Sequence, residues 1–284
     1  MHRLAQHIAT ILLTVVVGGL LSATLVRFAP GFGVDEAELD ARRSAASIEA
    51  IRQANGADKN VFVFYFHYLG RMAHGDLGVS RTLDRPVREL VAERMPETMK
   101  SVGWGVLLGW MLGMAFAIPV AMSRSWMFDT LASSVAGILL CIPAAVLSLL
   151  FVISRAPARL VIALIIFPKV FRYARNLLVR CADLPHVLTA RAKGLDSVRV
   201  LLWHVLPNAG PQLVALAGVS VSLAFAAAIP VEVLCDLPGL GQLAWKAALG
   251  RDLYLLTNLT MIVTVVTLIA NSSADLLAPR RSES

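Results

Sequence analysis

The stretch SVGWGVLLGWMLGMAFAIPVAM, residues 101–122, contains no charged side chain. A helix needs about 20 apolar residues to cross a hydrocarbon core about 30 Å thick, so this stretch predicts a transmembrane helix. Four further uncharged runs are long enough for the same role, at residues 8–26, 130–154, 211–231 and 253–274. The whole chain is 57% hydrophobic and 16% charged, whereas soluble domains are roughly 45–50% apolar. These runs predict an all-α integral membrane protein.

A sixth span is predicted at residues 156–178, although Arg159 and Lys169 interrupt it. A charge at the centre of a span costs about 2.5–3.5 kcal/mol, so we expect this helix to lie inside the helix bundle. Lys169 either extends its amine toward the membrane surface or lines a polar pathway. With six spans, both chain termini lie on the same side of the membrane.

Basic residues in the short loops predict the orientation, since Lys and Arg concentrate on the cytoplasmic side. If both termini are cytoplasmic, the inside segments hold eleven basic residues and the short outside loops hold four, namely Arg155, Arg159, Lys246 and Arg251. The first apolar run is longer than the 7–15-residue core of a signal peptide, so we interpret it as a retained helix. The cytoplasmic loops account for most of the net charge of +7, so a nucleic-acid partner is not needed to explain it.

Three parts are expected along the chain. Residues 1–28 form the N-terminal tail and first span, residues 29–97 form an external subdomain, and residues 98–284 form a core with the other five spans. Within that core, residues 170–206 make the longest cytoplasmic loop, where apolar and basic residues alternate at helical spacing. Gly194 interrupts the pattern, and a glycine costs about 1 kcal/mol in a helix interior. We therefore predict two short helices that meet at Gly194 and lie across the membrane face.

Motifs for catalysis and metal binding are missing from the sequence. It contains neither the phosphate-binding pattern GxxxxGK[ST] nor the zinc-protease pattern HExxH. Cys141, Cys181 and Cys235 fall in three different environments and predict neither disulfides nor a metal cluster. Glu232 and Asp275 lie at span ends, where we expect solvated helix caps rather than proton relays. We therefore expect a chain that is not an enzyme and holds no metal or cofactor of its own.

Three separated motifs resemble one family. TARAKGL, residues 189–195, with HVLPN, residues 204–208, resembles the EAA loop of the membrane subunits of bacterial ATP-binding-cassette (ABC) importers. Within that family, these two segments are most similar to the corresponding loop of the peptide and nickel permeases. HGDLGVS, residues 74–80, resembles the GDLG motif that precedes their second span. LPGLGQLAWKAALGRDLYLL, residues 237–256, resembles their outer loop with its PGLG turn and RD pair.

The resemblance implies the type I permease fold of ABC importers, with about six transmembrane helices and an external subdomain after the first. It also implies a non-catalytic, multi-pass permease subunit of the bacterial cytoplasmic (inner) membrane that carries peptides, nickel or related small solutes. The expected partners are a second permease subunit in a heterodimer, two ATP-binding subunits that hold ATP and Mg, and an extracytoplasmic solute-binding protein.

The resemblance assigns two sets of residues in this chain. The cytoplasmic set lies in the loop at residues 180–208, whose short helices dock on the ATPase in such importers: Thr189, Ala190, Arg191, Ala192, Lys193, Gly194, Leu195, His204, Pro207 and Asn208. Gly194 allows a close backbone approach there because it has no side chain. The external set belongs to the two outer motifs: Gly75, Asp76, Gly78, Pro238, Gly239, Gly241, Arg251 and Asp252.

The chain departs from the family pattern at three places. Leu188 stands at the acidic first position of the loop, and His204 stands where an aliphatic residue is common. Only SRAPAR, residues 154–159, joins the third and fourth predicted spans, where the family has a substantial outer loop. This shortening admits an alternative, a transport-inactive membrane scaffold or assembly subunit built on the same fold. A proton-coupled carrier is a second alternative, and it predicts a buried Asp or Glu in the bundle.

Overall fold

The computed structural model describes residues 75–80, 82–123, 125–250 and 252–277, with isolated helical positions at 13, 16–18, 20, 24 and 70. The first predicted span and most of residues 29–97 therefore lie outside the described residues. Two compact units divide the chain, one of residues 1–94 with 243–265 and one of residues 95–242 with 266–284. Helices α5 (Val87–Ser123), α12 (Leu240–Leu249) and α13 (Leu253–Leu277) each contribute to both units.

The first unit contains a short antiparallel hairpin of β1 (Val79–Ser80) and β2 (Arg85–Pro86), in which Val79 pairs with Pro86 and Ser80 with Arg85. Gly75 and Gly78 precede the hairpin with φ of 79° and 75°, a region that glycine enters without steric cost. Helix α5 begins directly after β2 and continues for 37 residues. The polar first turns of α5 therefore lead without a break into the uncharged run at residues 101–122.

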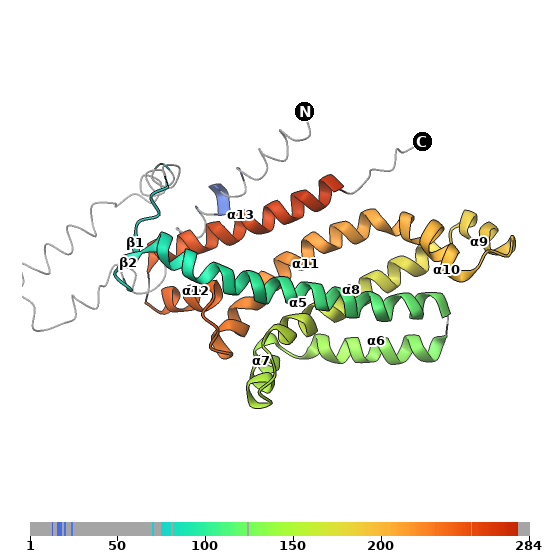
Figure 1. The fold of residues 1–284 in the computed structure, drawn as a ribbon, viewed down its shortest axis with the longest axis horizontal. Helices are drawn as coiled ribbons and strands as arrows, with labels where there is room; N and C mark the ends of the chain where they lie inside the picture. The colour runs from blue at the N-terminus through green and yellow to red at the C-terminus, as the bar shows by residue number, and fades with distance from the viewer. Residues whose placement is uncertain are drawn as a thin grey trace, which may run out of the picture. The chain divides into compact units, whose positions relative to one another are not determined.

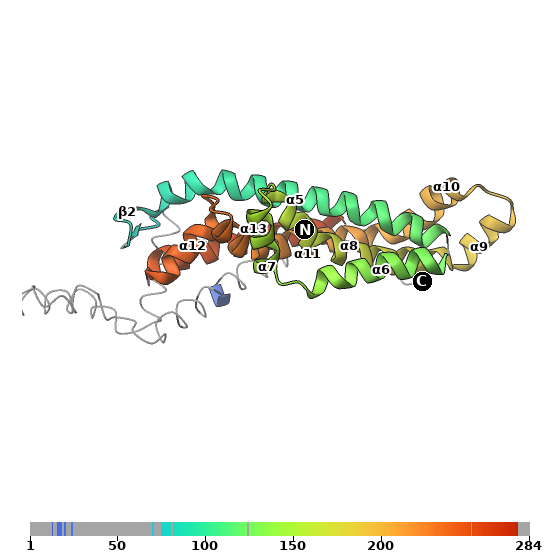
Figure 2. The same cartoon turned by 90° about the horizontal axis from the view of Figure 1, so that it is seen from below.

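The second unit is a helix bundle. Its remaining elements are α6 (Trp126–Cys141), α7 (Ala144–Ile153), α8 (Arg159–Ala182), α9 (Pro185–Ala192), α10 (Ser197–Val200), the π-helix η1 (Leu201–Val205) and α11 (Leu206–Leu234). Helix α8 packs against α6, α7 and α11, and buries Phe171 and Leu178 completely. Figures 1 and 2 show α9 and α10 at one end of α8 and α11, the end at which α5 is followed by α6.

Three glycines bring α5 into close contact with α8. Gly105, Gly109 and Gly113 recur every four residues and so share one face of the helix. A Cβ atom at these positions would lie 2.5, 2.8 and 2.6 Å from side-chain atoms of Ile162, Ile166 and Val170, respectively. Small residues at this spacing let membrane helices approach with their backbones nearly in contact. The order of the contacts also shows that α5 and α8 run in the same direction.

Three described helices are long and apolar enough to cross a membrane: Val87–Ser123, Ser197–Leu234 and Leu255–Ala274. The bent pair α6 and α7 makes a fourth if it is counted as one span, with an angle of 94° between the two helices. The prediction of a single continuous helix over residues 130–154 is therefore wrong. Pro143 explains the break, because the residue before a proline is pushed out of the helical region, and Ile142 has φ −82° and ψ 120°.

The loop that we predicted to be cytoplasmic is shorter than expected. Helix α8 continues to Ala182, so only residues 183–196 separate it from the next long helix, and α9 lies within them. The prediction of two helices that meet at Gly194 is confirmed. The second of them is not a separate surface helix, however, because α10 continues through η1 into α11 as one 38-residue helix. Helix α8 itself is 24 residues long, about 36 Å at 1.5 Å per residue, and is continuous through Pro168.

Candidate functional site

The turn at Gly194 has the geometry of a Schellman helix cap. The Gly194 N–H donates to the Arg191 carbonyl at 2.9 Å, and the Leu195 N–H donates to the Ala190 carbonyl at 3.3 Å. Gly194 has φ 78°, and nothing lies within 4 Å of a Cβ placed there. Within this chain glycine is therefore required by the left-handed backbone, not by close packing. Asp196 follows as the N-cap of α10, and its carboxylate accepts from the Val198 N–H at 3.1 Å.

This segment divides its side chains between the bundle and solvent. Val187, Ala190, Val200 and Val205 are buried in the core that also holds Phe171 and Leu178 of α8. The opposite face exposes 47% of Leu188, 61% of Val198 and 73% of Trp203, together with Lys193. A rigid turn anchored on one side therefore presents apolar and basic groups on the other.

The residues of the HVLPN motif attach α9 to the start of α11. The Asn208 side-chain amide donates to the His204 carbonyl at 2.6 Å, and its Nδ2 lies 3.0 Å from Nε2 of His186 in α9. The Thr189 hydroxyl donates to the Pro185 carbonyl at 3.0 Å within α9. The predicted residues of the cytoplasmic set thus lie together, and His186 lies among them, a contact that no sequence pattern indicated.

In the first unit, Asp252 connects the two outer motifs, which lie far apart in the sequence. Its side chain is 1% exposed and accepts from the Ser80 hydroxyl at 2.6 Å and the Thr82 N–H at 3.1 Å. Its other carboxylate oxygen accepts from the Leu255 N–H at 3.0 Å, which caps the first turn of α13. The Asn258 amide donates to the Leu77 carbonyl at 2.9 Å and holds the same segment. Asp76 lies in this segment and accepts from the Gly78 N–H, whereas Arg251 lies outside the described residues.

In the second unit, Glu232 organises the PGLG turn. Its carboxylate accepts from the Thr98 hydroxyl at 2.7 Å and from the N–H groups of Gly241 and Gln242 at 2.6 and 3.4 Å. The Thr98 oxygen in turn accepts from the Leu240 N–H at 2.7 Å. These N–H groups belong to the first turn of α12, which a carboxylate stabilises.

The surroundings of Glu232 leave no room for residues larger than glycine at two positions of the PGLG turn. A Cβ at Gly239 would overlap its carboxylate, and one at Gly241 would lie 2.7 Å from the Ile229 Cα. Glu232 is 0% exposed, so the expectation of a solvated cap is wrong for this residue. The sequence placed it correctly at a span end, but could not show that α5 and the PGLG turn cover it. The side chain of Asp275 lies outside the described residues.

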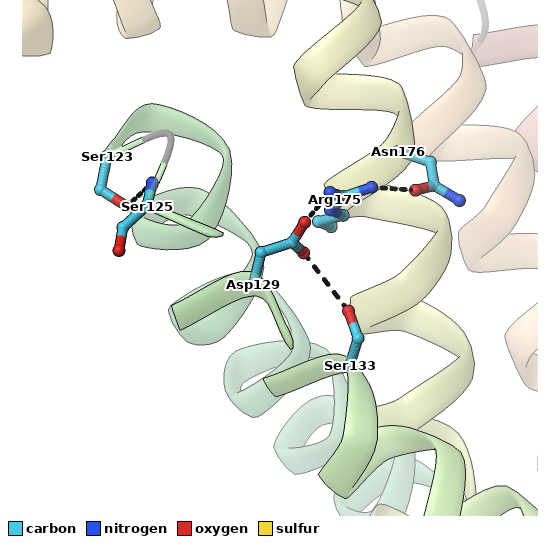
Figure 3. Close-up of polar contacts among 6 residues, drawn as sticks. All are labelled: Ser123, Ser125, Asp129, Ser133, Arg175 and Asn176. Carbon is cyan, nitrogen blue, oxygen red and sulfur yellow. Dashed lines mark hydrogen bonds and ion pairs between the residues drawn. The ribbon is translucent and has the colours of Figure 1, made fainter. Parts of the chain in front are cut away.

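A polar contact that sequence reasoning missed joins α6 to α8 (Figure 3). Asp129 and Arg175 point toward each other and form an ion pair, with side chains that are 31% and 28% exposed. The Ser133 hydroxyl donates to Asp129 at 3.3 Å, and the Arg175 guanidinium also donates to Asn176 at 2.8 Å. Because 46 residues separate the partners, neither local spacing nor composition could have indicated the pair. Among the described residues, no group of three or more His, Cys, Asp or Glu is arranged to hold a metal ion.

Comparisons with known proteins connect this geometry to transport. Residues 105–283 match the family model of the binding-protein-dependent transport system inner membrane component. A Brucella abortus protein, provisionally named a peptide transport system permease, is 27% identical over 98% of this chain and 95% of its own length. The glutathione transport system permease protein GsiC of Pectobacterium atrosepticum is 29% identical over 97% of this chain and 94% of its own length. An inward-facing structure of the MetNI methionine ABC transporter has the same fold, with a TM-score of 0.60 and 16% identity over 67% of this chain and 95% of its own.

Proposed function

The chain belongs to the inner membrane components of binding-protein-dependent transport systems, the permease subunits of ABC importers, and we propose that it carries peptides or peptide-like solutes across the bacterial inner membrane. The observation that carries this proposal is the nearly full-length match to permeases named for peptides and for glutathione. The two outer motifs, which resemble those of peptide permeases, support it, because hydrogen bonds to Asp252 and Glu232 hold both motifs in ordered structures. Peptides are therefore the first solutes to test, ahead of nickel.

The energy for import comes from partner subunits in this proposal. The sequence has no GxxxxGK[ST] loop, so two ATP-binding subunits would hold ATP and Mg, and the chain would do no covalent chemistry. A second permease subunit would complete the pathway, and an external solute-binding protein would deliver the solute. Both termini would be cytoplasmic, as the distribution of Lys and Arg predicts.

The docking surface for the ATPase would be the outer face of α9 and α10. Leu188, Val198 and Lys193 are exposed there on a turn whose backbone is fixed by two cap hydrogen bonds and by Asp196. Anchoring through Val187, Ala190 and Val200 would let a movement of the docked subunit pass directly into α8 and α11. Gly194 has open space beside it, which fits a close backbone approach by a partner.

The test uses the assembled importer in proteoliposomes, with ATP hydrolysis and peptide uptake measured together. Val198→Asp is expected to lower solute-stimulated ATP hydrolysis and uptake more than tenfold, because it places a charge in the docking surface. The matched control is Leu83→Asp, which changes an exposed aliphatic residue in the external turn, 37% exposed, and should leave both rates unchanged. Equal coupling in the Val198→Asp variant and the wild type would refute the docking role.

Gly194 gives a second variant that separates docking from folding. Asn accepts a positive φ far better than β-branched residues do, so Gly194→Asn keeps the turn while adding a side chain. A docking role predicts a folded variant with weak coupling. A purely structural role predicts full coupling in Gly194→Asn and loss of folded protein in Gly194→Val.

The two alternatives predict different results in the same assay. A scaffold subunit predicts assembly with the partners but no uptake, whatever peptide is supplied. A proton-coupled carrier predicts uptake driven by a pH gradient without ATP. The buried Glu232 meets the carrier's requirement for an acid, but its oxygens accept from Thr98 and from the first turn of α12, which favours a fixed structural role.

A further inference from the structure

One face of α8 carries a polar stripe in an otherwise apolar bundle. Lys169, Arg172, Tyr173, Asn176 and Arg180 are spaced by three and four residues and therefore share a face of the helix. Lys169 is half-buried and the other four are exposed, including 45% of Tyr173. We call these five residues the α8 stripe.

Among the described residues, no element packs over the α8 stripe, which is the exposed side of the helix. The remaining faces pack against α6, α7 and α11, and its first turns pack against the glycines of α5. Arg175 lies beside the stripe: it forms an ion pair with Asp129 of α6 and also donates to Asn176 of the stripe at 2.8 Å. Within the described part of the chain, Lys169, Arg172 and Arg180 form no ion pair, and the nearest acid on the helix is Asp183 at its cytoplasmic end.

If the uncharged run at residues 101–122 spans the membrane, the contacts between α5 and α8 place Lys169 near the middle of the bilayer. A Cβ at Gly113 of α5 would touch Val170, so Lys169 lies at the level of the centre of the uncharged run at residues 101–122. Lys169 is also halfway along α8, about 15 Å from Arg159 and about 16 Å from Arg180 at 1.5 Å per residue. A lysine side chain is far shorter than that, so its amine cannot reach either end of α8 by extending along the helix.

A cation at this depth cannot face hydrocarbon at low cost, and ionisable groups in spans typically face water-filled paths. We infer that the α8 stripe lines the cytoplasmic half of the translocation pathway and binds the carboxylates of anionic peptides as they leave. An ammonium and two guanidinium groups match carboxylates in charge and hydrogen bonding, and Tyr173 and Asn176 add neutral polar groups between them. This inference rests on the proposed function and narrows its substrate class to acidic peptides.

The first experiment measures initial uptake of Ala-Asp-Ala, Ala-Ala-Ala and Ala-Lys-Ala by the assembled importer. Arg172→Gln and Lys169→Gln are each expected to lower the ratio of Ala-Asp-Ala to Ala-Lys-Ala uptake about tenfold. Arg159→Gln is the matched control, because it removes the same charge from the same helix outside the stripe, and it should leave the ratio unchanged. If the stripe variants slow all three peptides equally, the inferred carboxylate binding is overturned.

The second experiment does not depend on transport. In a background without Cys141, Cys181 and Cys235, Tyr173→Cys is treated in membranes with anionic and cationic methanethiosulfonate reagents. A cationic aqueous path predicts rapid labelling that is at least fivefold faster with the anionic reagent. Met111→Cys is the control for lipid exposure, since Met111 is 60% exposed on α5 at a similar depth and should not react.

The two experiments separate the inference from the proposed function. Absence of uptake of all three peptides by the wild type would refute peptide import, and the thiol reaction would then decide the inference alone. Unreactive Tyr173→Cys would show that the stripe faces lipid or a protein partner and would overturn the inference. Equal rates with the two reagents would show water without a cationic site, and would overturn it as well.

Discussion

Replacing Gly109 with alanine is expected to loosen the contact between α5 and α8. The added Cβ would lie 2.8 Å from the Ile166 Cβ and 3.0 Å from the Ala163 carbonyl oxygen. Carbon atoms normally meet at about 3.5–4.0 Å, so one helix must move by about 1 Å. Overpacking of this kind costs about 1–3 kcal/mol. Helix propensity acts in the opposite direction, because alanine is better than glycine by about 1 kcal/mol in a helix interior.

Gly103→Ala isolates the steric cost. Gly103 lies in the same helix, is exposed, and has nothing within 4 Å of a Cβ, so its substitution brings only the gain in helix propensity. The two variants should therefore differ by about 1–3 kcal/mol in the free energy of unfolding, with Gly109→Ala the less stable. Unfolding in mixed detergent and SDS micelles, followed by circular dichroism, measures that difference. A difference below about 0.5 kcal/mol, the usual range for surface substitutions, would refute close packing at Gly109.

Three further predictions concern the polar contacts. Glu232→Ala leaves the Thr98 hydroxyl and the Gly241 N–H buried without an acceptor, which costs about 1–3 kcal/mol for each group. The same unfolding assay should therefore show a large loss of stability, and an unchanged unfolding midpoint would contradict the hydrogen-bond network. Asp252→Ala removes a helix cap that contributes about 0.5–2 kcal/mol, so hydrogen exchange should become faster at the Thr82 and Leu255 amides. The control variant Asp76→Ala should leave both amides protected. A double-mutant cycle on Asp129 and Arg175 should give a coupling free energy of only about 1 kcal/mol, because water screens a pair whose side chains are almost a third exposed. If the two single substitutions have additive effects on the free energy of unfolding, the ion pair does not contribute.

The local sequence pattern correctly predicted the helix end at Gly194, but it did not predict that α10 continues into α11. Gly194 marks a helix end because glycine at this position relieves the strain of a positive φ, and that requirement is local. The continuation of α10 into α11 depends on Val200 and Val205, which are buried in the core of the bundle. Burial against other helices overrides the weak local preferences that suggested a separate surface helix.

The glycine repeat at residues 105, 109 and 113 is visible in the sequence. Four-residue repeats of small residues in an apolar run indicate a helix contact surface. The pattern names the face but not the partner, and only the structure shows that Ile162, Ile166 and Val170 of α8 occupy it. The break at Pro143 was also available from local rules, since proline disfavours helix in the residue before it.

Sequence alone predicted that this chain is a helical membrane protein, where its long apolar runs lie and that a helix ends at Gly194. Those properties depend on the thickness of the bilayer and on residues within a turn or two of each other. Which polar groups are buried together depends on the tertiary fold, because Ser80 and Asp252 are 172 residues apart and Thr98 and Glu232 are 134 apart. The tertiary structure also shows which face of α8 the other described helices leave exposed, since the sequence marks the polar and apolar sides of a helix but not the neighbours that cover them.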